Sequence, residues 1–349
     1  MNQLKVAILY QSKVPPAIDG IVKPIKEGGY SDSGADIAMA LKQKQIEIIT
    51  PVKTPTVKND FDWVFADTEE GIGLAIELGA NLFWLNTVLY TDHPILKFKN
   101  KNLLIVGQDP QKVEMFDDKF YTNNLLRENS LPIPKSFLIA KDVSEINNLE
   151  FPFVIKPIRG RGSQGVSVVY NHKEFDEKVF DLISAKIYGT KIMVEDFLPG
   201  NEITLTIMPP GNYTIKNKKI EKNDYWTLPV VGRFNHENDI APYNGIVAVV
   251  NNSKILSIKE LESTEIQNIS QKCEFATSLI VARAPIRIDC RKNKKGKYYI
   301  FDLNLKPNMT GASRPHREDQ DSLTMIAAKG IGWEYPDLIQ NIVNQHWKL

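Results

Sequence analysis

Apolar and polar positions repeat with two different periods through the first third of the chain. Short β-branched runs, typical of strands, are separated by segments with the spacing of an amphipathic helix. This alternation predicts a parallel α/β sheet of the Rossmann-like kind in a first unit, residues 1–110. Strands are expected at 5–10, 46–49, 62–66 and 102–106, and helices at 33–44 and from residue 69 onward.

The first helix and the loop before it carry two local signals. Ser33, followed by Asp36, predicts a helix start with the serine as its cap and Ile37 on the buried face. The loop 27–31 contains two glycines and lies beyond the carboxyl end of a strand, where open α/β sheets bind small ligands. Ligand contact and plain chain reversal both account for this turn.

The pattern changes after Phe116, where a new unit is expected. A helix over 118–129 ends at a segment with two prolines, which cannot continue it. We predict a central unit, 111–193, and a last unit, 194–349. Strands are expected at 153–156, 166–170, 191–195, 202–208, 245–250, 286–290 and 298–304, and helices at 174–186 and 264–279.

Composition and charge exclude several classes of protein. Lysine and arginine number 43 against 42 acidic residues, and the net charge of +1 predicts neither nucleic-acid nor membrane binding. Cys273 and Cys290 stand in no CxxC or Cys/His cluster, which argues against a zinc site or a disulfide framework and favours a reducing cytoplasm. The first residues lack the pattern of a secretory signal, and the most apolar stretch, 71–90, is too polar to span a bilayer.

A glycine-rich loop follows the strand that ends at Lys156. Its spacing, Gly160-x-Gly162-Ser163-x-Gly165, matches the dinucleotide fingerprint, but the next residues are β-branched and strand-like. A fingerprint must lead into a helix, so we predict a strand-loop-strand hairpin whose amides close over a polyphosphate. A flexible surface hairpin is the alternative.

Two acidic groupings follow. Glu195 and Glu202 flank a reversal and can face one cleft, although solvated turn carboxylates have the same pattern. Farther on, alternation places Arg287 and Asp289 on one face of a strand, with Asp302 and Asn304 on one face of the next. If these strands pair antiparallel, their oxygen donors suit Mg²⁺, and the arginine can stabilise negative charge on a transferring group. A structural Arg/Asp ion pair is the alternative.

The order of these motifs resembles the ATP-grasp superfamily, most closely its D-alanine–D-alanine ligase-like branch, from about Asp118 to Ser313. The resemblance implies an ATP-grasp fold, ATP and Mg²⁺ as ligands, and a homodimer. It implies that Lys119 and Lys156 bind phosphates and that Glu202 binds ribose. The implied adenine strand contains Glu195, Asp196, Phe197 and Leu198, and the implied metal ligands are Asp289, Asp302 and Asn304.

Several positions depart from that family pattern. Asp302 stands where a glutamate is usual, and Asn308 replaces a glycine in the segment ending at Ser313, the serine that resembles the one holding a substrate carboxylate. The glycine-serine-glutamate loop that positions the first D-alanine is absent after Tyr10. We therefore expect a ligase for a carboxylate other than D-alanine. Arg314, His316 and Arg317 either contact an anionic substrate or are exposed basic residues at a loop end.

The activity implied is transfer of the γ-phosphoryl group of ATP to a carboxylate, followed by attack of an amine on the acyl phosphate. Arg287, Lys156 and Ser313 are the catalytic candidates, because this chemistry needs positioning and charge neutralisation. A non-catalytic ATP-binding regulatory protein and an ATP-grasp kinase are the alternatives. The sequence does not identify the two substrates.

Overall fold

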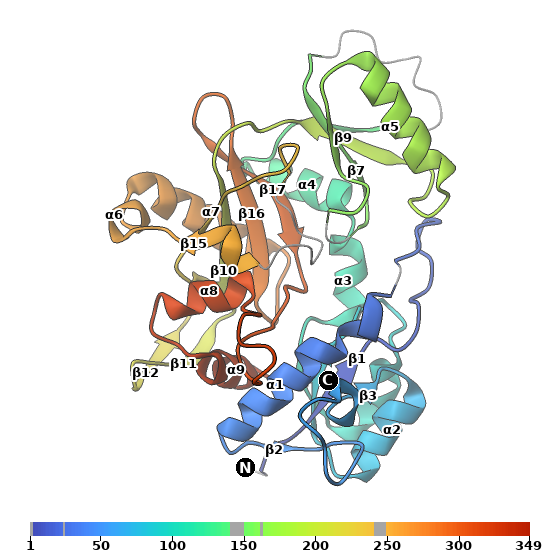
Figure 1. Ribbon diagram of the computed structural model, residues 1–349, viewed down its shortest axis with the longest axis vertical. Coiled ribbons are helices and arrows are strands. Elements are labelled where there is room, and N and C mark those ends of the chain that lie inside the picture. The colour runs from blue at the N-terminus through green and yellow to red at the C-terminus, as the bar shows by residue number, and fades with distance from the viewer. Residues whose placement is uncertain (1–2, 24, 140–149, 161–162, 241–248) are drawn as a thin grey trace.

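The computed structural model describes residues 3–23, 25–139, 150–160, 163–240 and 249–349. It is a mixed α/β structure with three larger sheets and one separate hairpin (Figure 1). In the described part of the chain, no helix has both the length and the apolar character needed to cross a membrane.

The first sheet is parallel around β1, as the alternation predicted. Its strand order is β18-β5-β4-β1-β2, with β3 also paired to β1. Both faces are covered: Ile8 of β1 packs with helices α1 and α9, whereas Leu9 packs with α2. This double burial explains the nearly continuous apolar run of β1. The elements are β1 Lys5–Tyr10, η1 Glu27–Tyr30, α1 Ser31–Gln43, β2 Glu47–Ile48, η2 Asp60–Asp62, β3 Phe65–Ala66, α2 Glu69–Glu77, β4 Leu82–Asn86, η3 Pro94–Lys101 and β5 Leu104–Val106.

Some local expectations for this sheet were wrong. Ser33 does not cap α1, because the helix begins two residues earlier and the Ser33 hydroxyl donates to the Tyr30 carbonyl at 3.1 Å. Residues 60–62 form a 3-10 turn, so only Phe65–Ala66 of the strand expected at 62–66 pairs with β1. Strand β4 was missed, since its sequence LFWLN lacks a clear alternation. The buried face of α1, with Ile37, was predicted correctly.

A buried carboxylate joins the carboxyl ends of three strands of the first sheet. Asp67 follows β3, and its Oδ1 accepts hydrogen bonds from the Ser12 backbone N–H at 2.9 Å and the Ser12 hydroxyl at 2.8 Å. Its Oδ2 accepts from the Thr87 hydroxyl, just after β4. Burial alone would raise the pKa of Asp67, but the His93 ring, whose Nε2 lies 3.8 Å from Oδ2, and the hydrogen bonds from Thr87 and Ser12 hold it below the ordinary 3.8. The ionised form is therefore the one that the fold stabilises.

We expect Asp67→Asn to lower the free energy of unfolding by about 2–3 kcal/mol near neutral pH, because the amide loses charge-assisted hydrogen bonds. A depressed folded-state pKa contributes stability above the unfolded-state pKa, and this is lost as pH falls through the folded-state pKa. The difference between wild type and variant should therefore shrink below about pH 4. Urea unfolding across this pH range measures it, and a difference independent of pH would contradict the assigned charge.

The central sheet is antiparallel, in the order β6-β9-β7-β8. Helix α5 covers one face, where Phe175 and Val179 pack on Ile155 and Val194 (Figure 1). The opposite face of this sheet faces the other parts of the molecule. The elements are α3 Pro110–Phe116, α4 Lys119–Glu128, β6 Ser136–Ile139, β7 Phe153–Pro157, β8 Ser167–Val169, α5 His172–Ser184 and β9 Ile192–Asp196.

The last sheet is also antiparallel and has one apolar and one polar face. Its order is β15-β14-β10-β16-β17, with β13 paired to β10. Leu205 and Ile288 pack against Ile269 and Cys273 of α7, so the residues that alternate with them point to the other side. The elements are β10 Glu202–Met208, β11 Gly211–Ile215, β12 Lys218–Lys222, β13 Trp226–Thr227, β14 Val231–Arg233, η4 Val249–Asn251, β15 Ser253–Ile255, α6 Ile258–Leu261, α7 Thr264–Leu279, β16 Ile286–Lys292 and β17 Tyr298–Asn304.

The end of the chain returns to the first sheet. After α8 (Leu323–Lys329) and α9 (Tyr335–Val343), strand β18 (Trp347–Lys348) pairs antiparallel with β5. Helix α9 packs on α1 and places the carboxyl terminus beside the first sheet (Figure 1). The strand expected at 245–250 falls largely on residues 241–248, outside the described residues, and 249–251 form η4.

Candidate active site

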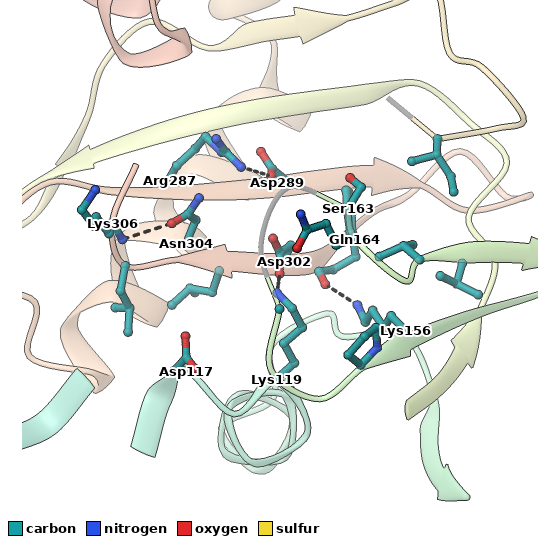
Figure 2. A pocket seen from close by; sticks show the side chains of 18 of the residues that line it. Asp117, Lys119, Lys156, Ser163, Gln164, Arg287, Asp289, Asp302, Asn304 and Lys306 are labelled. Carbon is teal, nitrogen blue, oxygen red and sulfur yellow. Dashed lines mark hydrogen bonds and ion pairs between the residues drawn. The ribbon is translucent and has the colours of Figure 1, made fainter. Parts of the chain in front are cut away.

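A cavity of about 310 Å³ lies where the three sheets meet. The first sheet contributes the residues after β4 and β5, and the other two contribute strand residues and the glycine hairpin. Figure 2 shows Lys119 of helix α4 pointing across it toward Asp302 of β17, with Arg287 and Asp289 of β16 beside that pair. The predicted site residues that line it are Lys119, Lys156, Gly160, Ser163, Glu195, Asp196, Phe197, Leu198, Glu202, Arg287, Asp289, Asp302 and Asn304.

The polar row on β16 and β17 forms the floor of this cavity. Asp289 lies opposite Asp302, and Arg287 lies opposite Asn304, in the antiparallel register that the sequence led us to expect. Arg287 Nη2 donates to Asp289 Oδ2 at 3.1 Å, and the Thr204 hydroxyl of β10 donates to Asp289 Oδ1 at 2.7 Å. A hydrogen-bonded arginine and two facing carboxylates are thus fixed on a rigid pair of strands.

The oxygen atoms of this row are of the kind that a cation needs, although Lys119 and Arg287 already pair with its two carboxylates. Burial raises the pKa of Asp289, Arg287 opposes that rise, and the neighbouring Asp302 and Glu202 carboxylates add to it. A cation would relieve this repulsion, and carboxylate and amide oxygens are the donors that Mg²⁺ prefers. Asn304 Oδ1 also accepts from the Lys306 backbone N–H at 3.0 Å, which orients the amide. Asp289, Asp302 and Asn304 therefore fit Mg²⁺.

Two lysines reach the same row from the central unit. Lys119 is the first residue of α4, after the cap Asp118, and its ammonium forms an ion pair with Asp302. Lys156 ends the apolar part of β7, and its Nζ donates to Glu195 Oε1 at 2.6 Å and to the Phe301 carbonyl at 3.0 Å. Burial would lower the pKa of Lys119, but the Asp302 carboxylate holds it above its ordinary value. Both ammonium groups are therefore positioned for an anion.

The glycine loop joins two antiparallel strands, β7 and β8, so the hairpin prediction is correct and the dinucleotide fingerprint does not apply. Gly160 and Ser163 line the cavity, whereas Gly162 lies outside the described residues. Gly165 has φ +72°, and a Cβ there would stand 2.9 Å from Pro157 Cγ. Gly165 therefore shapes the turn from behind and is not among the lining residues.

Strand β9 and the turn after it form the other end of the cavity. Glu195 is buried and lines the cavity, and its Oε2 has no hydrogen-bond partner among the described residues. Burial raises the pKa of Glu195, with Lys156 opposing the rise. Glu202 Oε2 lies 2.9 Å from His236 Nε2, and the Arg291 guanidinium stacks 5.1 Å from the Phe197 ring centroid. A buried acceptor beside an aromatic ring suits a purine base with an amino group.

Ser313 and its neighbours are not brought into the cavity. The Ser313 hydroxyl donates to Asp36 Oδ1 at 3.0 Å, on α1 of the first unit. Arg314 is fully buried against Asp36 at 2.8 Å, and Arg317 Nε donates to Asp36 Oδ2 at 2.9 Å. Neither arginine is therefore an exposed loop-end residue or a lining residue; only His316 is exposed.

The sequence did not single out the lining residues at the first-unit end, among them Lys23, Lys306 and Tyr30. The two glycines before Tyr30 were the available signal, because that loop was considered as a ligand contact. Lys306 lies within 304–313, the segment that resembles the family motif, at a position where that motif requires no particular residue.

Residues 135–344, more than half of the chain, match the profile of the family described as "D-ala D-ala ligase C-terminus". The D-alanine–D-alanine ligase of Aquifex aeolicus (strain VF5) is 28% identical over 246 residues, which are 68% of this chain and 72% of the relative. The D-alanine–D-alanine ligase of Buchnera aphidicola subsp. Schizaphis graminum is 28% identical over 237 residues, 65% and 68% of the two chains.

Solved structures agree on the fold. A D-alanine–D-alanine ligase from Bacillus anthracis, complexed with ATP, has a TM-score of 0.65 at 15% identity and covers 98% of this chain and 96% of its own. The VanG D-Ala:D-Ser ligase from Enterococcus faecalis has a TM-score of 0.62 at 13% identity, with 99% of each chain covered. The expected ATP-grasp fold with its parallel-sheet first unit is confirmed, and with the matched profile it shows that the chain belongs to the D-alanine–D-alanine ligase C-terminal family.

Proposed function

We propose that the protein is an ATP-dependent ligase that joins a small carboxylate to an amine through an acyl phosphate, releasing ADP and phosphate. The observation that carries this proposal is the row of Arg287, Asp289, Asp302 and Asn304, which two lysines face across one cavity. Membership of the ligase family supports the reaction class. Fold similarity alone would be weaker support for the reaction class, because one fold serves many functions.

In this proposal the nucleotide lies along the central unit. Glu195, Asp196, Phe197 and Leu198 hold adenine, and Glu202 holds the ribose. Lys119 and Lys156 hold the phosphates. The hairpin with Gly160, Gly162, Ser163 and Gly165 covers them, and Asp289, Asp302 and Asn304 hold Mg²⁺, which neutralises charge on the phosphate oxygens when bound.

The chemistry then needs few groups from the protein. A carboxylate oxygen of the substrate attacks the γ-phosphorus and ADP leaves; the amine nitrogen next attacks the acyl carbon, loses a proton and expels phosphate. Arg287 lies where negative charge develops in both steps, and the hairpin keeps water from the acyl phosphate. Ser313 would reach the second substrate only by giving up its hydrogen bond to Asp36.

The substrates are part of the proposal. The similar proteins are named for D-alanine or for D-Ala:D-Ser, whereas the loop after Tyr10 lacks the glutamate of that family. We therefore propose a carboxylate other than D-alanine. The unit boundaries at 110 and 193, a cytoplasmic location and a homodimer stay predictions of the same kind.

The test is ADP and phosphate release from the purified protein with ATP and Mg²⁺, screened across single amino acids and pairs. We expect release that requires both partners and is lost in Asp289→Ala, because that variant lacks a carboxylate of the polar row. Release with one partner and a stable phosphorylated product would identify a kinase instead. ATP binding without turnover under every pair would favour a regulatory protein.

A further inference from the structure

The end of the cavity farthest from the adenine strand is lined by cations. Lys23 and Lys306 line it together with Tyr30. Figure 2 places Lys306 on the other side of Asn304 and Asp302 from Lys156, so it lies beyond the polar row as seen from the proposed nucleotide. In the proposed function the substrate carboxylate approaches the polar row from the side of Lys306.

Lys306 is held in place by contacts with two units. Its Nζ lies 3.4 Å from the centroid of the Tyr30 ring, and its backbone N–H donates to Asn304 Oδ1. Tyr30 is fixed in turn by Gly29, whose carbonyl accepts from the Gln11 N–H at 2.8 Å. A Cβ on Gly29 would stand 1.9 Å from the Gln11 carbonyl oxygen, so only glycine permits this approach. The ammonium group therefore has a defined position over an aromatic face.

Lys23 comes from a segment of the first unit that crosses to the central unit. Ile21 forms a β-bridge with Tyr188, and the Val22 N–H donates to the Ile187 carbonyl at 3.1 Å. Lys23 then forms an ion pair with Asp117, whose Oδ2 also lies 3.6 Å from Arg159 Nη1. Arg159 Nη2 also lies 3.6 Å from Asp19 Oδ2 and 3.7 Å from Asp118 Oδ2, so Lys23 and Arg159 both face carboxylates of the protein already.

The acid–base balance of this end selects an anion. Among the described lining residues, the first unit contributes no carboxylate; those residues are Lys23, Tyr30, Thr87, Val88, Leu89 and Gln108. Asp117, the nearby acid, already faces two cations. An ammonium group on the substrate would meet the Lys306 ammonium here, whereas a second anionic group would be attracted by it.

Resting on the proposed function, we infer that the carboxylate substrate carries a second acidic group, bound by Lys306. One carboxylate lies at the polar row and accepts the phosphoryl group. The other lies against the Lys306 ammonium, which the Tyr30 ring holds in place.

Hydroxylamine trapping tests this inference without knowledge of the natural amine. The hydroxylamine nitrogen attacks the acyl carbon of the acyl phosphate, loses a proton and expels phosphate, leaving a hydroxamate that is measured as its ferric complex. The probes are matched pairs that differ by one carboxylate: butyrate and succinate, pentanoate and glutarate, and D-2-aminobutyrate and D-aspartate. We expect kcat/KM to be about tenfold or more higher for a dicarboxylate than for its partner.

Variants assign the preference to the site. Lys306→Met should reduce the dicarboxylate-to-monocarboxylate ratio about tenfold, whereas Lys306→Arg should retain most of it. Lys218→Met, in the exposed hairpin β11–β12, is the matched control and should keep the wild-type ratio. Thermal unfolding establishes that each variant is folded.

Three outcomes would overturn the inference. If the monocarboxylates form hydroxamate as well as the dicarboxylates do, the inferred second acidic group is contradicted, whereas the proposed ligase function is not. A rise in the KM for ATP in Lys306→Met, with the ratio unchanged, would place this lysine on the nucleotide. No hydroxamate from any carboxylate, although ATP binds, would count against the proposed ligase function itself.

Discussion

Arg287→Met is expected to lower kcat for ADP release by about 10²- to 10³-fold, the loss typical of removing one donor from a developing negative charge. The Arg287 side chain is 5% exposed, and Nη2 is fixed by Asp289 at 3.1 Å. In the proposed reaction such a preorganised guanidinium would stabilise the transferring phosphoryl group and the tetrahedral oxyanion without reorganising. The KM for ATP should change much less than kcat, because the proposal assigns the nucleotide contacts to the lysines and β9.

Arg287→Lys separates charge from geometry. Lysine keeps the positive charge but lacks the planar fork, so a loss between those of wild type and methionine is expected. Rates of ADP release and ATP titrations on the same preparations measure both parameters, and circular dichroism checks the fold. A methionine variant with wild-type kcat would show that Arg287 is only the structural partner of Asp289.

The polar row could be predicted from the sequence because two short-range rules define it. Side chains alternate along a strand, and the short lysine-rich segment 292–297 between the two strands favours antiparallel pairing, which brings Arg287 and Asp289 to Asn304 and Asp302. The register shift between Asp289 and Cys290 has no comparable signal. The hairpin after Lys156 was also predictable, since β-branched residues follow the glycines.

Contacts between units could not be predicted in this way. Ser313 bonds Asp36 across 277 positions, and β18 joins β5 after the whole chain has passed through the other units. The periodic pattern of apolar residues indicates local structure and does not specify contacts between residues so far apart in the sequence. Arg314 looked like an exposed loop residue, because a buried arginine is recognisable only when its counter-ions are known. The first-unit end of the cavity depends on the same docking, so Lys306 and Tyr30 were missed.

Arg314→Met is the substitution expected to cost the most stability, about 3–5 kcal/mol, because it removes the fully buried one of the two cations that face buried Asp36. Arg314 Nε donates to Asp36 Oδ1 at 2.8 Å, Nη1 donates to Asp60 Oδ1 at 2.5 Å, and Nη2 donates to the Asp32 carbonyl at 3.0 Å. Burial raises the pKa of Asp36 even though Arg317 and Arg314 oppose the rise. A carboxylate in that position depends strongly on each cation.

A double-mutant cycle isolates this dependence. Asp36→Asn removes the charge that Arg314→Met strands, so the double variant should be less destabilised than the sum of the single variants by about 1–3 kcal/mol. Arg317→Met is the matched control with a smaller expected loss, since its side chain is 15% exposed and Arg314 still faces Asp36. Urea unfolding supplies the free energies. Strictly additive losses would mean that Asp36 and Arg314 are not energetically coupled. In that case another contact would have to hold residues 305–317, which include Lys306, against the first unit.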